Sequence, residues 1–213
     1  PDVFLRDHLA ANRPGIFTGV TANWPMADWT WSSLRRRFGD VPVQACVGRN
    51  ANPSCDADWR SHVEEMLFRD FLDRVVEAEG TNDVYLISNN KALLREGFRG
   101  LLADLRPDER LFDGERLEGA CSLWIGPGGT TTPMHHDTTN ILFLQVLGRK
   151  RFRMVAPSET RLWDTMNGFY CQSEQVLEPG RGRADHGDVL VQEATLGPGD
   201  ALFIPAGWFH EVE

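Results

Sequence analysis

The sequence predicts an α+β domain built on a double-stranded β-helix, the double-sheet antiparallel barrel also called a jelly-roll. Helical periodicity is concentrated in the first half of the chain, and short apolar strands separated by turn residues dominate after residue 118. A chain of 213 residues that is 41% hydrophobic is long enough for one well-packed core. We therefore predict a single domain over residues 1–213, with supporting strands and helices in 1–118 and the barrel core in 119–213.

Helices and strands are both predicted before the barrel. Strands are expected in GIFTGV, VPVQACV and DVYLIS, where apolar residues alternate between turn signals. Ser61 and Glu64 have the spacing of a capping box, and the apolar positions that follow predict a helix to about residue 79. Further helices are predicted over residues 3–11, from Ser32 to Gly39, and over about 91–105.

Strands dominate the second half. ACSLWIG leads through a Pro-Gly-Gly turn to a stretch between Thr130 and Lys150, and within it ILFLQVL is apolar on both faces and predicted to be buried on both. Residues 157–188 have no regular pattern and predict a long irregular segment. Such segments in compact domains are often functional.

A candidate metal site lies at the start of this strand-rich half. His135 and Asp137 are two residues apart, so in an extended backbone their side chains project from one face. His210, after a glycine-rich turn in LGPGDALFIPAGWFHEV, is the third candidate ligand. Two histidines and one carboxylate form the facial arrangement of non-haem Fe(II) oxygenases, which leaves positions open for substrate and dioxygen.

Other histidines are weaker candidates. A lone His-x-Asp pair is more often solvated or capping than metal-binding, but the apolar strand that follows this one favours ligands on a rigid element. His136 has the opposite strand parity and is predicted to be packed or exposed. His186, within the irregular segment, is a rival ligand, although a flexible loop positions ligands poorly.

Lys150 is predicted to point inward. After Gly148, strand alternation places Lys150 on one face with Phe152 and Met154, while the three neighbouring arginines share the other face. A buried ammonium group must be paired with an anion. A bound anion next to the metal is a candidate partner.

Composition excludes several classes of function. The formal charge of -9 is spread along the chain, which disfavours a nucleic-acid partner, and the basic cluster Arg35–Arg37 lies on a predicted helix as a solvated face. No run approaches the ~20 apolar residues of a membrane span, and there is no signal-peptide pattern. Four cysteines without C-x-x-C spacing fit free thiols in a reducing cytoplasm. Because the chain lacks an initial methionine and stops three residues after His210, we expect the natural polypeptide to extend at one or both ends.

The two segments TPMHHDTTNILFLQVLGRKRFRMVAP and GPGDALFIPAGWFHEV resemble the JmjC-type, cupin-like oxygenases that depend on Fe(II) and 2-oxoglutarate. The likeness is greatest to their small hydroxylase group, such as the asparaginyl hydroxylase that acts on hypoxia-inducible factor. PGIFTGVTANWP and VYLISNN are similar to the N-terminal part of the family, so the resemblance covers nearly the whole chain.

The resemblance implies a cupin barrel and assigns residues. It makes His135, Asp137 and His210 the iron ligands, and it makes Lys150 the cation that holds the distal carboxylate of 2-oxoglutarate. Thr132 and Tyr85 match positions that hydrogen-bond the same carboxylate. Asn140 stands one residue earlier than the asparagine common in the family, so its role is left open.

We therefore expect an Fe(II)- and 2-oxoglutarate-dependent oxygenase that uses dioxygen to hydroxylate a side chain of a protein or peptide. A lysine demethylase is an alternative within the same class. A metal-dependent cupin enzyme that does not use 2-oxoglutarate is disfavoured by the inward Lys150, and a non-catalytic cupin binding module is disfavoured by the intact ligand set. The oligomeric state is not predicted.

Overall fold

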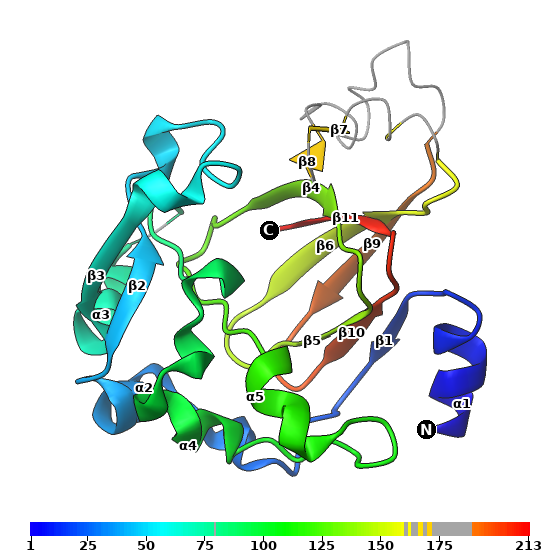
Figure 1. The fold of residues 1–213 in the computed structure, drawn as a ribbon, viewed down its shortest axis with the longest axis horizontal. Helices are drawn as coiled ribbons and strands as arrows, with labels where there is room; N and C mark the ends of the chain where they lie inside the picture. The colour runs from blue at the N-terminus through cyan, green and yellow to red at the C-terminus, as the bar shows by residue number, and fades with distance from the viewer. Residues whose placement is uncertain (79, 160–161, 163–165, 168–169, 172–188) are drawn as a thin grey trace. The chain divides into compact units, whose positions relative to one another are not determined.

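The structure, a computed structural model, describes residues 1–78, 80–159, 162, 166–167, 170–171 and 189–213 (Figure 1). His186 and most of the predicted irregular segment lie outside these residues. The described residues form two compact units, one of Pro1–Ala22 with Thr131–Glu213 and the other of Asn23–Thr130. This division differs from the predicted internal boundary at residue 118, because strand β1 (Gly15–Phe17) pairs with β10 (Ala201–Ile204) in the first unit. The single domain over the whole chain stays a prediction.

The unit Asn23–Thr130 combines short helices with one two-stranded sheet. Its regular elements are α2 (Trp31–Phe38), α3 (Phe68–Glu77), α4 (Arg99–Leu102), α5 (Leu117–Ala120), β2 (Pro42–Cys46) and β3 (Val63–Leu67). Single 3-10 turns lie at Pro25–Asp28, Arg49–Ala51, Trp59–His62, Ser88–Asn90, Ala92–Leu94, Glu96–Phe98 and Gly114–Arg116. Thr30 caps the start of helix α2: its hydroxyl accepts the Ser33 N–H at 3.0 Å, which satisfies one of the N–H groups left without a partner at a helix end.

The core of this unit is aromatic. Phe98 packs its ring against Phe38 and Phe68, with ring centroids 5.7 and 5.0 Å apart. Helix α3 contributes Phe68, Phe71, Leu72 and Val75, the buried face of an amphipathic helix. The basic cluster on α2 is partly neutralised, because Arg35 pairs with Asp73 and Arg37 with Asp104.

Four helix or strand predictions in this unit are wrong, two of helices and two of strands. Residues 63–67 form β3 and not the first turns of a helix, because Val63–Leu67 pairs residue by residue with β2, and the helix begins only at Phe68. The helix predicted over 91–105 is broken into short turns, because Lys91 has a left-handed φ of 51° and Arg95 is extended, with φ -78° and ψ 131°. ACSLWIG and DVYLIS form single bridges, Leu86 with Ile125 and Cys46 with Tyr85, in place of full strands.

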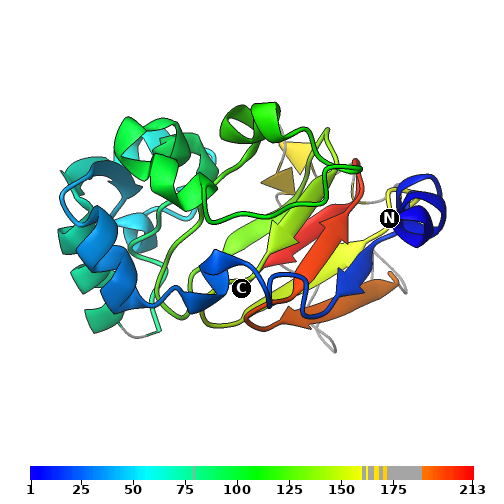
Figure 2. The same cartoon turned by 90° about the horizontal axis from the view of Figure 1, so that it is seen from below.

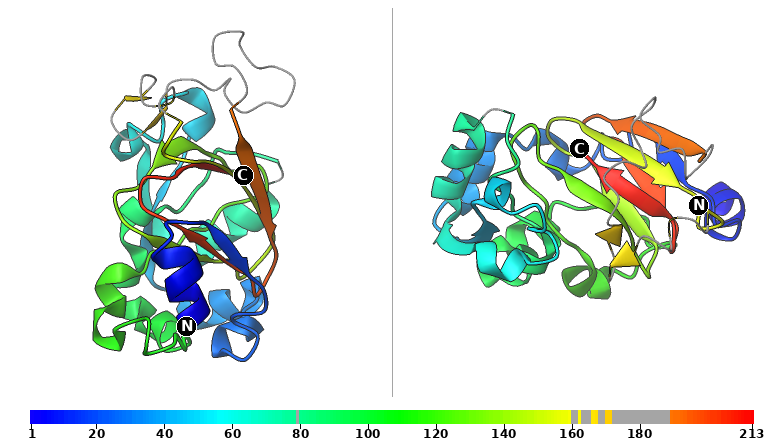
Figure 3. Two further views of the ribbon diagram at one scale, coloured as in Figure 1. Left: turned by 90° about the vertical axis from the view of Figure 1, so that its right-hand side faces the viewer. Right: turned by 90° about the horizontal axis from the view of Figure 1, so that it is seen from above.

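The other unit contains two antiparallel sheets. One has the strand order β1-β10-β5 and the other β7-β8-β4-β11-β6-β9. The remaining elements are α1 (Asp2–Phe4), a π-helical turn (Leu5–Leu9), β4 (Thr132–His136), β5 (Ile141–Leu144), β6 (Lys150–Val155), β7 (Met166–Asn167), β8 (Tyr170–Cys171), β9 (Val191–Leu196) and β11 (Phe209–Val212). Figure 2 shows β1 beside β10, and Figure 3 shows β4, β11, β6 and β9 side by side.

The two sheets of this unit pack face to face. Phe152 and Met154 of the six-stranded sheet share one buried cluster with Leu202 and Ile204 of the three-stranded sheet. Phe143 of β5 meets Phe152 of β6 with ring centroids 5.0 Å apart. The α+β class and the antiparallel pairing are therefore as predicted. Strand β5 is less buried than predicted, because all four of its residues are only half-buried.

Candidate metal centre

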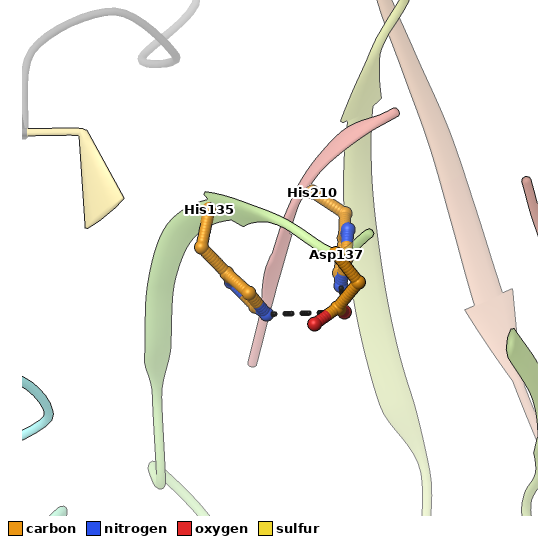
Figure 4. Close-up of side chains that lie close together, drawn as sticks. All are labelled: His135, Asp137 and His210. Carbon is orange, nitrogen blue, oxygen red and sulfur yellow. Dashed lines mark ion pairs between the residues drawn. The ribbon is translucent and has the colours of Figure 1, made fainter. Parts of the chain in front are cut away.

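The three candidate ligands converge within the two-sheet unit (Figure 4). His135 lies in β4, Asp137 is one residue beyond the end of that strand, and His210 lies in β11 directly opposite His135. One ligand atom from each of the three residues lies within 4.8 Å of the others. The nearest Asp137 carboxylate oxygen is 3.8 Å from His135 Nε2 and 3.4 Å from His210 Nε2. Strand pairing thus brings together residues that are 75 positions apart in sequence.

Backbone carbonyls orient both imidazole rings. His135 Nδ1 lies 2.8 Å from the carbonyl oxygen of Pro133, and His210 Nδ1 lies 3.1 Å from that of Trp208. Because a carbonyl oxygen only accepts a hydrogen bond, each Nδ1 must carry the proton. Each Nε2 then presents a lone pair toward the Asp137 carboxylate. Lone pairs from two imidazoles and a carboxylate that face one point are the arrangement that a metal cation stabilises.

The electrostatic setting favours the ligand forms of these groups. Burial, followed by the neighbouring His210, lowers the pKa of His135 to about 4. Burial alone would raise the pKa of Asp137, but the adjacent rings of His210 and His135, which favour the ionised carboxylate whenever they are protonated, outweigh this effect and lower the pKa. At neutral pH His135 is therefore neutral and Asp137 ionised, which are the protonation states that bind a metal. Asp137 is also the most accessible of the three side chains, 39% exposed against 4% for His210.

Lys150 shares a sheet face with the two histidines. His210 is paired with Met154 across β11 and β6, and directly opposed residues lie on the same face of a sheet. Lys150, Phe152 and Met154 alternate along β6, so they share that face, and Phe152 and Met154 are buried. Lys150 itself is half-buried. The predicted inward face of Lys150 is confirmed, while its role with a ligand stays a prediction.

Thr132 reaches the same face through a β-bulge. The register between β11 and β4 shifts between His210 and Val212, so Thr132 lies opposite Val212, which is itself opposite Phe152. Thr132 and His135 are three residues apart, so in a regular strand they would lie on opposite faces. The register shift places both on the same face. Thr132 is buried.

Tyr85 belongs to the other compact unit. It is buried there, with the guanidinium of Arg49 5.2 Å from its ring centroid and Trp124 5.6 Å away. Its predicted part in co-substrate binding stays a prediction.

His136 lies on the opposite face of the sheet, as its parity predicts. It is paired with Phe209, and the two ring centroids are 5.6 Å apart in an edge-to-face contact. Two groups that shape the site, the backbone carbonyls of Pro133 and Trp208, are not predictable from the sequence. Backbone carbonyls leave no residue-type signal, so only the strand geometry reveals them.

Comparison with known proteins shows the family of this chain. The model of the cupin-like domain family matches residues 1–213, and the chain belongs to this family of JmjC-type proteins. It is 29% identical to a zebrafish protein named lysine-specific demethylase 8, over 97% of this chain and 52% of that protein. It is 30% identical to the Arabidopsis protein named lysine-specific demethylase JMJ30, over 98% of this chain and 49% of that protein.

A third relative has a different name. The zebrafish tRNA wybutosine-synthesizing protein 5 is 28% identical over 99% of this chain and 68% of that protein. The chain spans about half the length of the two demethylase-named relatives. Among the described residues, no helix is long and apolar enough to cross a membrane.

Proposed function

We propose that this chain is an Fe(II)- and 2-oxoglutarate-dependent oxygenase that hydroxylates a side chain of a protein or peptide. The observation that supports it best is the convergence of His135, Asp137 and His210 on the sheet face that also carries Lys150. A ligand set alone is compatible with several cupin enzymes. A cation on the same face adds a site for an acidic co-substrate.

The donor set fits iron. Two neutral imidazoles and one carboxylate on one side of a cation are the facial set of non-haem Fe(II) enzymes, and they leave the opposite positions open. We assign His135, Asp137 and His210 as the ligands. Iron, 2-oxoglutarate and dioxygen together supply the oxidation that breaks an unactivated C–H bond, with succinate and carbon dioxide as co-products. The protein contributes the geometry and the exclusion of water.

Lys150 is assigned to the distal carboxylate of 2-oxoglutarate. Lys150 lies on the sheet face of Phe152 and Met154, which is also the face of His210, so a cation stands on the same face as the ligand set. Thr132 is assigned as a hydrogen-bond donor to the same carboxylate, since it is buried on that face. Tyr85 is assigned to the same task on the family resemblance alone. We further infer that the two packed sheets form the jelly-roll barrel of the family.

Charge and the names of the relatives support the proposed substrate class. The chain carries a formal charge of -9, and two arginines of its basic cluster are already paired with aspartates, which favours a protein substrate over a nucleic acid. Two relatives are named lysine-specific demethylases, so demethylation of a methylated lysine is the second candidate. We infer a cytoplasmic location from the scattered cysteines.

The test is succinate formation from 2-oxoglutarate by the purified chain with Fe(II). It should be measured alone, with an unmodified peptide library, with methyl-lysine peptides and with tRNA. Stimulation by unmodified peptides supports hydroxylation, and stimulation by methyl-lysine peptides with release of formaldehyde supports demethylation. Stimulation by tRNA alone would contradict the protein substrate, and no succinate in any arm would contradict the oxygenase.

A further inference from the structure

The position of Asp137 is not fixed by strand pairing. The pairing of β4 with β11 ends at His136, opposite Phe209, and Asp137 is the next residue. The residues after it, Thr138 to Asn140, are exposed. His135 and His210 are held by the sheet, so the third side chain of the cluster depends on how the turn that follows β4 is held.

Two hydrogen bonds join this turn to the turn before β11. The Gly207 N–H donates to the backbone carbonyl of Asp137 at 2.9 Å. The Ala206 N–H donates to the side-chain Oδ1 of Asn140, also at 2.9 Å. Gly207 has a φ of 83°, in the left-handed region that glycine adopts without strain, and this conformation presents the two consecutive N–H groups to the facing turn.

The same turn also holds His210. The backbone carbonyl of Trp208 accepts the hydrogen bond from His210 Nδ1. The turn of residues 205–208 is therefore hydrogen-bonded both to Asp137 and to His210. The distance between these two side chains therefore depends on the two turns staying together. Asn140 is the residue that contributes a side chain to that junction.

We propose that Asn140 is a positioning residue for the metal site. Its amide oxygen anchors the turn after β4 to the turn before β11 and so keeps the Asp137 carboxylate within reach of a cation held by His135 and His210. This inference rests on the proposed function, because it takes those three residues as the metal ligands. Asn140 is three residues after Asp137 in the sequence, and it acts on the ligand through the backbone of the turn and not as a metal ligand itself.

The expected effect is modest because the hydrogen bond is exposed to solvent. Losing a neutral hydrogen bond of this kind changes an equilibrium by about three- to tenfold. Asn140→Ala should weaken metal binding by that factor. Asn140→Asp keeps an acceptor oxygen at the same place and should bind metal within about twofold of the wild type. Asn140→Ser, whose hydroxyl ends nearer the backbone, should resemble Asn140→Ala.

The experiment is a Mn(II) titration of the metal-free chain, with free Mn(II) followed by electron paramagnetic resonance. Thr139→Ala is the matched control, because it shortens an exposed side chain of the same turn and leaves the Asn140 bond intact. The unfolding temperature of each metal-free variant is measured in parallel. A purely structural role for Asn140 would lower that temperature without selectively weakening Mn(II) binding.

The outcomes separate the two claims. A weaker Mn(II) affinity in Asn140→Ala and Asn140→Ser, restored in Asn140→Asp and unchanged in Thr139→Ala, supports the inference. An unchanged affinity in Asn140→Ala and Asn140→Ser, no rescue by aspartate, or an equal loss in Thr139→Ala overturns it. If Asn140→Ala does not fold, the serine and aspartate variants give the same decision. His135→Ala tests the proposed function itself: if it binds Mn(II) like the wild type, the ligand assignment fails first.

Discussion

His135 and His210 lie opposite each other on β4 and β11, with ring centroids 4.2 Å apart. Each ring is bonded at Nδ1 to the carbonyl of the residue two positions earlier, Pro133 in one strand and Trp208 before the other. The ring orientations are therefore set by backbone carbonyl groups, which no amino-acid substitution removes. This makes the ligand side chains themselves the direct way to test the site.

Alanine at His135, Asp137 or His210 should each abolish turnover and metal retention. Two protein donors that remain after such a change compete poorly with water for a divalent cation. Iron content after reconstitution, together with Mn(II) titration, measures the loss. Zinc or nickel in the purified wild type would be consistent with the same ligand set, because available metals can displace iron.

His136→Ala is the matched control for the ligand variants. His136 is adjacent to His135 in sequence but packs on Phe209 at the other face of the sheet. We expect it to lose some stability and to keep its iron. Loss of iron in His136→Ala would mean that the face assigned to the metal is wrong.

Lys150→Met should raise the 2-oxoglutarate requirement and leave metal affinity nearly unchanged. Removing one partner of a desolvated charge pair costs about 2 to 5 kcal/mol, which is roughly 30- to several-thousand-fold in affinity. The measurement is an anaerobic titration of the iron complex with 2-oxoglutarate, followed by metal-to-ligand charge-transfer absorption. Lys150→Arg should rescue only in part, because its planar fork is bulkier than an ammonium group.

Arg151→Met is the matched control for Lys150. Arg151 is the next residue of β6, points to the opposite face and pairs with Glu213 at the surface. It should bind 2-oxoglutarate like the wild type. Equal dissociation constants for Lys150→Met and the wild type would remove the co-substrate role from Lys150, and a cupin enzyme that does not use 2-oxoglutarate would become the better hypothesis.

Most of the candidate site is predictable from the sequence, because side chains alternate between the two faces of a strand with a period of two residues. A spacing of two places His135 and Asp137 together, and alternation in β6 places Lys150 on the face of Phe152. The bulge that brings Thr132 onto that face has no residue-type signature, since it arises from the register between β4 and β11. The bond from Ala206 to Asn140 links turns that are 66 residues apart, and local patterns do not report it.

The fold was harder to predict where local and non-local preferences compete. Val63 and Leu67 fit the apolar spacing of a helix that includes Phe71, yet residues 63–67 form a strand because β2 is available as a partner. A window of sequence shows the helical spacing but not the partner strand. The helix predicted over 91–105 is likewise interrupted by the extended backbone of Arg95, which is itself neither Gly nor Pro and so gives no such signal in the sequence.

Alkylation of the cysteines should follow their burial. Cys46 and Cys55 are buried free thiols, and Cys121 is a half-buried free thiol. Burial raises the pKa of Cys55 to about 11 and also raises those of Cys46 and Cys121, so little thiolate forms at neutral pH and the order of reaction is set by access to the reagent. In the native chain Cys121 should react before Cys46 and Cys55, and unreduced denatured protein should show four alkylatable sulfurs by mass spectrometry. A bridge between Cys46 and Cys55 would contradict the structure, in which both are free thiols, and would count against the proposed cytoplasmic location.

Asp104→Asn should lower the free energy of unfolding at neutral pH. The Asp104 carboxylate accepts hydrogen bonds from Trp29 Nε1 at 2.7 Å and from Arg37 at 2.6 Å, and its side chain is only 15% exposed. Asparagine keeps an acceptor but removes the charge, so we expect a loss of about 1 to 2 kcal/mol, the difference between a charge-assisted and a neutral hydrogen bond. Asp73→Asn is the control: its pair with Arg35 is exposed, so the effect should be smaller.

The pH dependence of that loss has a definite sign. Burial alone would raise the pKa of Asp104, but the hydrogen bonds from Arg37 and Trp29 outweigh it, so the folded pKa lies below the ordinary value. A depressed carboxyl pKa stabilises the fold above the unfolded pKa of about 3.9, and this contribution is lost as pH falls through the folded pKa. Urea unfolding should therefore show that the wild type exceeds Asp104→Asn in free energy of unfolding by a constant amount near neutral pH. This difference should shrink below about pH 4. A difference that persists undiminished in acid would mean that the stabilisation comes from packing and not from the ionised carboxylate.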